Sequence, residues 1–165
     1  MTSLVYRRTE SPLGELLLTG DGRVLRGLHM LDGRHPVSVR PDWVEAQDAF
    51  EDVRAQLAGY FAGRRTSFDV PLELEGTPFQ REVWQGLLEI GYGETISYGE
   101  LARRIGRPRA VRAVGLANGR NPIAVIVPCH RVIGADGTLT GYGGGLDRKR
   151  LLLDLEARLL APAMF

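Results

Sequence analysis

One segment, IVPCHRVI at residues 126–133, holds the only cysteine of the 165-residue chain. Apolar residues flank Cys129 on both sides and predict that the segment is buried. Pro128 fixes its own φ and restricts the residue before it, so the thiol is held in a defined backbone. A lone buried cysteine is most often a packing residue.

His130, the next residue, favours the alternative interpretation of Cys129 as a nucleophile. The thiolate is the reactive form of cysteine, and a neighbouring base or positive charge promotes it. Adjacent side chains on an extended strand point to opposite faces. Cooperation between Cys129 and His130 therefore requires either a bend in the backbone or a bridging water.

The overall composition is that of an ordinary globular chain, with 44% hydrophobic and 25% charged residues. No apolar run approaches the roughly 18 residues of a membrane helix, and the first residues lack the apolar core of a signal peptide, which predicts a cytoplasmic protein. A single cysteine excludes an internal disulfide and a cysteine-rich zinc site. His29, His35 and His130 lack the spacing of metal ligands, so we expect no metal and no cofactor.

Charge is distributed unevenly along the chain. The net charge is −3 over residues 1–76 and +4 over residues 77–165, and residues 101–135 contain no acidic side chain. A basic block of this kind indicates a nucleic-acid surface, although a solvated protein face remains an alternative. The block contains seven arginines: Arg103, Arg104, Arg107, Arg109, Arg112, Arg120 and Arg131.

The first part of the chain predicts a small α/β domain with a short antiparallel sheet. Turn signals separate three short β-type runs, and apolar residues at helical spacing follow them. This domain carries no catalytic motif, and Gly76 marks its expected end, so its bounds are 1–76. The expected strands are 4–9, 15–19, 24–30 and 68–74, and the expected helix runs from 41 or 42 to 61.

The second part, residues 77–165, predicts a mostly helical domain, which makes the fold class α+β. Thr77 and Pro78 resemble an N-cap followed by a first-turn proline, with the helix ending at Gly91. Residues 97–100 resemble a capping box ahead of a short helix. A further helix over 109–118, with Val111 and Val114 expected to face inward, completes a helix-turn-helix pattern.

The second helix of this pair is unusually poor in side-chain bulk. Small residues allow a backbone to approach another surface closely. Tight packing against the neighbouring helix and insertion into a narrow groove explain this composition equally well. The small residues are Ala110, Ala113, Gly115, Ala117 and Gly119.

Glu156 lies among leucines on the last predicted helix, which begins near residue 147 and ends at 159 or 160. Helical spacing places this carboxylate on the apolar face, where an unpaired charge is costly. We therefore expect a partner, either His130 or an arginine. The alternative is a carboxylate at the edge of the face that reaches solvent.

These residues resemble the O6-alkylguanine-DNA alkyltransferase family. The similarity rests on the PCHRV motif at 128–132, Asn121-Pro122 before it, GYGGG at 141–145 after it, and RAVG at 112–115. It extends at least from Thr77 to Glu156. The PCHR motif and the RAVG segment together are highly specific for this family. Residues 1–76 lack the cysteine that some relatives use for zinc.

The resemblance implies a protein that acts once. Cys129 would take the alkyl group from guanine O6 and keep it as a thioether. His130 would deprotonate the thiol through water, Glu156 would orient the imidazole, and Asn121 would brace the turn.

The resemblance also implies how the substrate base is held. Tyr98 would contact the flipped base and its flanking phosphate, and the backbone carbonyls of Cys129 and Val132 would accept from the guanine amine. Tyr142 would form a wall of the pocket. Gly143 would offer its N–H to O6, at a position where relatives often have serine.

The implied partner is duplex DNA that contains O6-alkylguanine. In this family the second helix of the pair enters the minor groove, and an arginine at the position of Arg112 fills the space that the flipped base leaves. The same comparison assigns Arg109, Ala113 and Gly115 to the DNA-binding surface. We expect a monomer in solution, with clustering on DNA left open.

Three other interpretations remain. A non-catalytic lesion sensor of the alkyltransferase-like type would lack Cys129. A cysteine hydrolase built on Cys129, His130 and Glu156 would turn over repeatedly. A helix-turn-helix regulator would have no need of the Pro128-Cys129-His130 motif.

Overall fold

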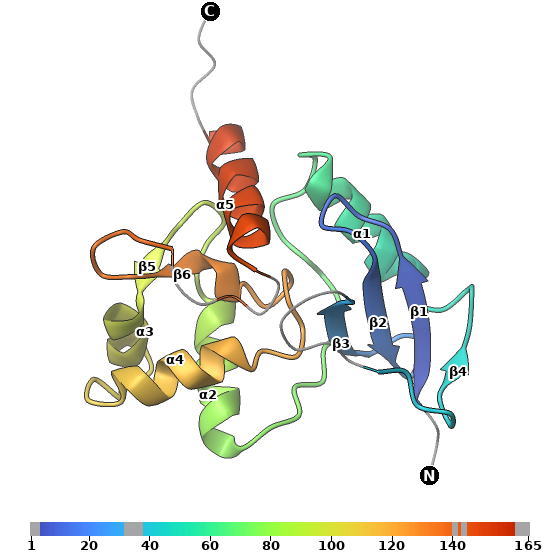
Figure 1. The fold of residues 1–165 in the computed structure, drawn as a ribbon, viewed down its shortest axis with the longest axis horizontal. Helices are drawn as coiled ribbons and strands as arrows, with labels where there is room; N and C mark the ends of the chain where they lie inside the picture. The colour runs from blue at the N-terminus through green and yellow to red at the C-terminus, as the bar shows by residue number, and fades with distance from the viewer. Residues whose placement is uncertain (1–3, 32–37, 140–141, 143–144, 161–165) are drawn as a thin grey trace, which may run out of the picture. The chain divides into compact units, whose positions relative to one another are not determined.

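Backbone contacts divide the chain into two units, Met1–Glu75 with Pro122–Ile126, and Gly76–Asn121 with Val127–Phe165. The computed structural model describes residues 4–31, 38–139, 142 and 145–160. Figure 1 shows the sheet and helix α1 of the first unit and the mostly helical second unit. The α+β class expected from the sequence is confirmed, as are the short antiparallel sheet and the mostly helical second part.

The sheet of the first unit has the order β3-β2-β1-β4. Its first three strands form an antiparallel meander, whereas β4 pairs parallel to β1. All five residues of β2 are buried, as expected for the central strand of a small sheet. The strands are β1 (Val5–Thr9), β2 (Leu16–Gly20), β3 (Leu25–Met30) and β4 (Val44–Glu45).

The helix expected from residue 41 or 42 begins later, since α1 spans Glu51–Phe61. Its predicted first turns instead hold β4, where the N–H of Val44 donates to the Leu4 carbonyl at 2.8 Å. Phe50, the residue before α1, has a φ of +57° and caps the helix with no side-chain bond. Pairing with the sheet edge therefore overrides the helical periodicity.

The expected strand over residues 68–74 is also wrong. This segment makes only one isolated parallel bridge, between Leu72 and Leu25 of β3. The Leu25 N–H donates to the Pro71 carbonyl, and the Glu73 N–H donates to the Leu25 carbonyl. Proline has no N–H, so Pro71 cannot continue a ladder of backbone bonds.

The second unit contains four α-helices, a 3₁₀ turn and a two-stranded parallel sheet within the described residues. The helices α3 and α4 form the expected helix-turn-helix pair. The elements are α2 (Pro78–Leu88), β5 (Ile96–Ser97), α3 (Tyr98–Arg104), α4 (Val111–Gly119), the 3₁₀ turn η1 (Cys129–Arg131), β6 (Val132–Ile133) and α5 (Leu146–Leu160).

The helix starts agree with their sequence signals in α2 and in part in α3. Thr77 and Gln80 form a complete capping box at the start of α2. At α3 the Ser97 hydroxyl accepts from the Glu100 N–H at 3.0 Å. The Glu100 carboxylate binds Arg103 at 2.8 Å, so the expected capping box is only half formed there.

Helix α4 packs against α2 through one buried stripe. The Trp84 indole N–H donates to the Ala117 carbonyl at 2.9 Å, and Val114 is fully buried. Val111 is 39% exposed, so the expectation that it faces inward is wrong. The buried stripe of α4 begins at Val114, and Val111, as the first residue of the helix, lies outside it.

Candidate active site

The backbone bends at Cys129, which is one of the two arrangements that would allow cooperation with His130. Residues 129–131 form the 3₁₀ turn η1, in which the Arg131 N–H donates to the Pro128 carbonyl at 3.0 Å. Cys129 is 6% exposed and His130 is fully buried. The strict alternation of an extended strand is therefore broken at these two residues.

Glu156 lies in the interior and has both of the partners that the sequence left open. Its Oε2 lies 2.8 Å from His130 Nε2. The guanidinium of Arg131 donates to both of its oxygens, at 2.9 Å from Nε and 3.0 Å from Nη2. Arg131 also donates to the Ile90 carbonyl at 2.7 Å. Because Glu156 is only 1% exposed, the solvent-edge alternative is wrong.

The Glu156 contact determines which nitrogen of His130 can act as a base. An ionised carboxylate only accepts hydrogen bonds, so His130 Nε2 carries the proton that faces Glu156. The Nδ1 atom is buried and has no hydrogen-bond partner among the described residues. Burial lowers the pKa of His130, while Glu156 raises it by a smaller amount. The neutral imidazole thus presents Nδ1 as a proton acceptor.

The thiol of Cys129 lies in surroundings that oppose and favour its ionisation. Burial raises the pKa of Cys129, whereas a hydrogen bond from Asn121 and the charge of Lys149 lower it. Asn121 Nδ2 also donates to the Val127 carbonyl at 2.7 Å. The side chain of Asn121 thereby links the two ends of the segment that precedes the nucleophile.

Between Asn121 and Val127 the chain belongs to the first unit. The Leu28 N–H of β3 donates to the Pro122 carbonyl at 2.9 Å. Val125 within this segment has a φ of +72°, which is strained for a β-branched residue. The hydrogen bond from Asn121 to the Val127 carbonyl joins the residues on either side of this segment, two positions before Cys129.

Two of the residues expected to contact the substrate base, Val132 and Tyr142, lie in the interior. Val132 is fully buried, and Tyr142 is 4% exposed. The Tyr142 hydroxyl has no hydrogen-bond partner in the part of the chain that the structure describes. The expected role of Gly143 lies outside the described residues.

Tyr98 lies beside the helix expected to bind DNA. A Cβ added to Gly115 would lie 3.7 Å from the Tyr98 ring, so this glycine allows the ring close to α4. Arg112 and Ala113 lie on the exposed face of the same helix, and Arg109 is exposed just before it. The structure therefore brings the expected DNA-binding residues onto one side of α4.

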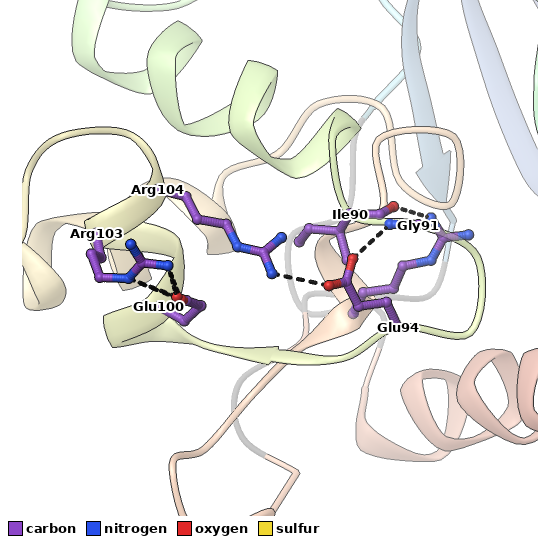
Figure 2. Close-up of polar contacts among 7 residues, drawn as sticks. Ile90, Gly91, Glu94, Glu100, Arg103 and Arg104 are labelled. Carbon is purple, nitrogen blue, oxygen red and sulfur yellow. Dashed lines mark hydrogen bonds and ion pairs between the residues drawn. The ribbon is translucent and has the colours of Figure 1, made fainter.

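The basic block separates into paired and unpaired arginines. Figure 2 shows Arg104 reaching Glu94, at 2.9 Å, and Glu94 accepting from the Gly91 N–H. Arg103 pairs with Glu100 in the same view, and Arg107 pairs with Glu82 at 3.1 Å. Glutamates before residue 101 thus neutralise part of the block. Three of its arginines make no ion pair within the described residues: Arg109, Arg112 and Arg120.

The sequence indicated an arginine as a possible partner of Glu156 without singling out Arg131, and it assigned no role to Lys149. Lys149 is fully buried, and its Nζ donates to the Val132 carbonyl at 2.6 Å. Lys149 precedes Glu156 by seven residues, so helical spacing places both on the same face of α5. The seven-residue spacing between Glu156 and Lys149, the only lysine of the chain, could have indicated that Lys149 also faces the site.

Over the described residues, no group of three or more histidine, cysteine or acidic side chains is arranged to hold a metal ion. No helix in the same part of the chain has the length and apolar character needed to cross a bilayer.

Comparisons with known proteins match both units. The model of the ribonuclease-like domain of 6-O-methylguanine DNA methyltransferase matches residues 4–74, and that of its DNA-binding domain matches residues 78–158. A methylated-DNA–protein-cysteine methyltransferase of Mycobacterium bovis is 59% identical over 96% of this chain and 94% of its own length. One from Methanosarcina acetivorans is 55% identical over 93% and 98%.

A solved structure leads to the same conclusion. The Mycobacterium tuberculosis OGT structure in complex with DNA has a TM-score of 0.89 and 58% identity, and the match covers 96% of each chain. The matched residues extend over both units and span the segment around the sole cysteine. The chain therefore belongs to the 6-O-methylguanine DNA methyltransferase family.

Proposed function

We propose that this protein repairs DNA by moving the alkyl group of O6-alkylguanine irreversibly onto its own Cys129. One observation carries the proposal: the only cysteine of a chain of this family adjoins a buried histidine–glutamate pair. The chain retains the nucleophile that a non-catalytic lesion sensor would lack. We place it in the cytoplasm and expect it to act as a monomer.

The transfer begins with removal of the thiol proton. Neutral His130 accepts it at Nδ1 through one water, and Glu156 stabilises the imidazolium that forms. The thiolate attacks the alkyl carbon, so a C–S bond forms as the C–O6 bond breaks. The released electron pair stays on guanine, which takes up a proton and leaves as the ordinary base.

The geometry of duplex DNA requires the base to leave the stack first. A thiol that is buried inside the protein cannot reach an alkyl group on a stacked guanine. Tyr98 contacts the flipped nucleotide, Tyr142 and the Val132 carbonyl hold its base, and Gly143 donates to O6. Arg112, with Arg109, Ala113 and Gly115, binds the DNA from the minor-groove side.

Intact-protein mass spectrometry after mixing with duplex DNA that holds one O6-methylguanine tests the proposal. We expect each protein molecule to gain one methyl group, because the product thioether is stable and the chain has no second thiol to displace it. Peptide mapping should place the methyl group on Cys129. Repeated turnover with an unmodified cysteine would favour the hydrolase alternative instead.

Replacing Glu156 with glutamine is expected to slow methyl transfer about tenfold, because the imidazolium loses its counter-charge. Arg131 would lose its carboxylate as well, so the free energy of unfolding should fall by about 3 kcal/mol. Single-turnover rates should be compared at equal folded fraction. Asp154→Asn, which neutralises an exposed carboxylate of the same helix, is the matched control. A folded Glu156→Gln protein with the wild-type rate would leave Glu156 with a structural role only.

A further inference from the structure

Lys149 occupies a position that is unfavourable for a charged side chain. It is fully buried, and it lies in the first turn of α5, where the helix dipole disfavours cations. Burial lowers the pKa of Lys149 to about 8, from the ordinary value of 10.5. Its proton is therefore bound less tightly in the folded chain than in the unfolded one. At neutral pH this lysine opposes folding, and the opposition fades as pH rises from about 8 toward 10.5.

The contacts of Lys149 direct its ammonium toward the reacting turn. Nζ donates to the Val132 carbonyl at 2.6 Å, and Val132 follows directly after the 3₁₀ turn that carries Cys129. The ammonium of Lys149 and a thiolate at Cys129 also influence each other. The ammonium lowers the pKa of Cys129, and a thiolate there raises the pKa of Lys149.

Other ionisable groups around this turn cannot supply the same charge. His130 is held neutral by burial, and Arg131 is committed to Glu156 and the Ile90 carbonyl. The Tyr142 phenol stays protonated, because burial raises its pKa well above the ordinary value. The charges of Cys129, Arg148 and Glu156 also act on this phenol. Among the described residues, Lys149 is the charged side chain whose field acts on the Cys129 thiol.

We propose that Lys149 is a positioning residue whose ammonium, anchored on the Val132 carbonyl, supplies the positive charge that favours the Cys129 thiolate. The proposal rests on the proposed function in taking Cys129 as the alkyl acceptor. Lys149 gives up no proton in the reaction: the thiol proton passes to His130, and the ammonium keeps its own. This role accounts for keeping a buried charge that weakens the fold.

Three variants separate the charge of Lys149 from its hydrogen bond. Lys149→Gln keeps a donor for the Val132 carbonyl but removes the charge. Lys149→Met removes both, and Lys149→Arg keeps the charge. Arg150→Gln is the matched control, because Arg150 is an exposed cation one residue further along α5.

The readout is the rate at which iodoacetamide modifies the sole cysteine across the neutral and alkaline range, followed by intact mass. We expect the midpoint of the glutamine and methionine variants to rise by at least about one pH unit, the size of shift that a nearby opposite charge produces. Methyl transfer at neutral pH should slow about tenfold with them and recover as pH rises. Lys149→Arg should stay near the wild-type midpoint, and Arg150→Gln should match wild type.

Several results would overturn the proposal. An unchanged midpoint in both uncharged variants would leave Lys149 a packing residue. A shift in Lys149→Met without one in Lys149→Gln would assign the effect to the hydrogen bond. An equal shift in Arg150→Gln would assign it to net charge. Thermal unfolding distinguishes a damaged fold, because removing this buried charge should not lower the melting temperature. The iodoacetamide assay needs no DNA, so a wild-type protein that reacts normally but accepts no methyl group would refute the proposed function alone.

Discussion

Replacing Cys129 with serine is expected to abolish methyl transfer, with a loss on the order of 10⁴-fold or more, the scale seen when a covalent nucleophile is removed. The buried imidazole of His130 can generate a thiolate from a thiol, whereas a hydroxyl is a much weaker acid and stays protonated before the attack. Serine oxygen is also a poor nucleophile for a saturated carbon compared with thiolate sulfur. Binding to DNA should persist, because Cys129 is buried and lies away from the exposed face of α4.

Two measurements on the same preparation test this expectation. Intact mass should show no adduct on Cys129→Ser after long incubation with O6-methylguanine duplex, and a gel-shift assay should show wild-type affinity for that duplex. Cys129→Ala serves as the control, since it removes the hydroxyl as well as the thiol. Loss of the methyl group from DNA with Cys129→Ser would mean that the lesion is hydrolysed or that another residue accepts it.

Local sequence signals predicted the parts of the fold that depend on neighbouring residues. The capping box at Thr77 joins residues three positions apart, and β1 to β3 are consecutive strands joined by short turns that the sequence marks. The start of α1 does not depend on neighbouring residues in this way. Trp43 and Ala46 have helical spacing with the apolar residues that follow, yet Val44 and Glu45 between them pair with β1, about 40 positions earlier. That pairing cannot be read from local periodicity.

The candidate site divides in a similar way. The bend at Cys129 was one of the two alternatives that cooperation with His130 allowed, and the burial of Glu156 was expected from its place among leucines. The pairing of the basic block could not be foreseen. Arg104 and Arg107 bind glutamates 10 and 25 positions earlier, and only the fold brings these side chains together. An acid-free stretch of sequence is therefore less basic in three dimensions than its composition indicates.

The division of the basic block into paired and unpaired arginines strengthens the case for Arg112 as a DNA-contacting residue. It is exposed, it makes no ion pair within the described residues, and Ala113 and Gly115 near it on α4 are small. An unpaired guanidinium at this position can enter a narrow groove without first breaking a salt bridge. Two roles fit that position: a phosphate contact, or a side chain that fills the space left by the flipped base.

We expect Arg112→Ala to slow methyl transfer from duplex DNA on the order of 10²-fold, because the extrahelical base would lose its support, and flipping costs a few kcal/mol. The reaction with free O6-benzylguanine should stay near the wild-type rate, since no base has to leave a stack. Arg112→Lys should recover only part of the duplex rate, because an ammonium lacks the planar group that stacks and bonds in the vacated space.

Arg109→Ala is the matched control, because Arg109 is also exposed and unpaired but precedes α4. If Arg109 contacts a phosphate, its loss should weaken DNA binding evenly across sequences and reduce the slope of affinity against salt by about one unit.

Single-turnover rates on duplex and free base, each at two salt concentrations, distinguish the two roles of Arg112. Equal slowing of Arg112→Ala on both substrates would indicate a damaged pocket. A salt response like that of Arg109→Ala, with the duplex rate restored at saturating protein, would reduce Arg112 to a phosphate contact. Slowing that persists at saturation and is confined to the duplex would place Arg112 in the flipping step, because binding is then complete and only the cost of holding the base outside the helix remains.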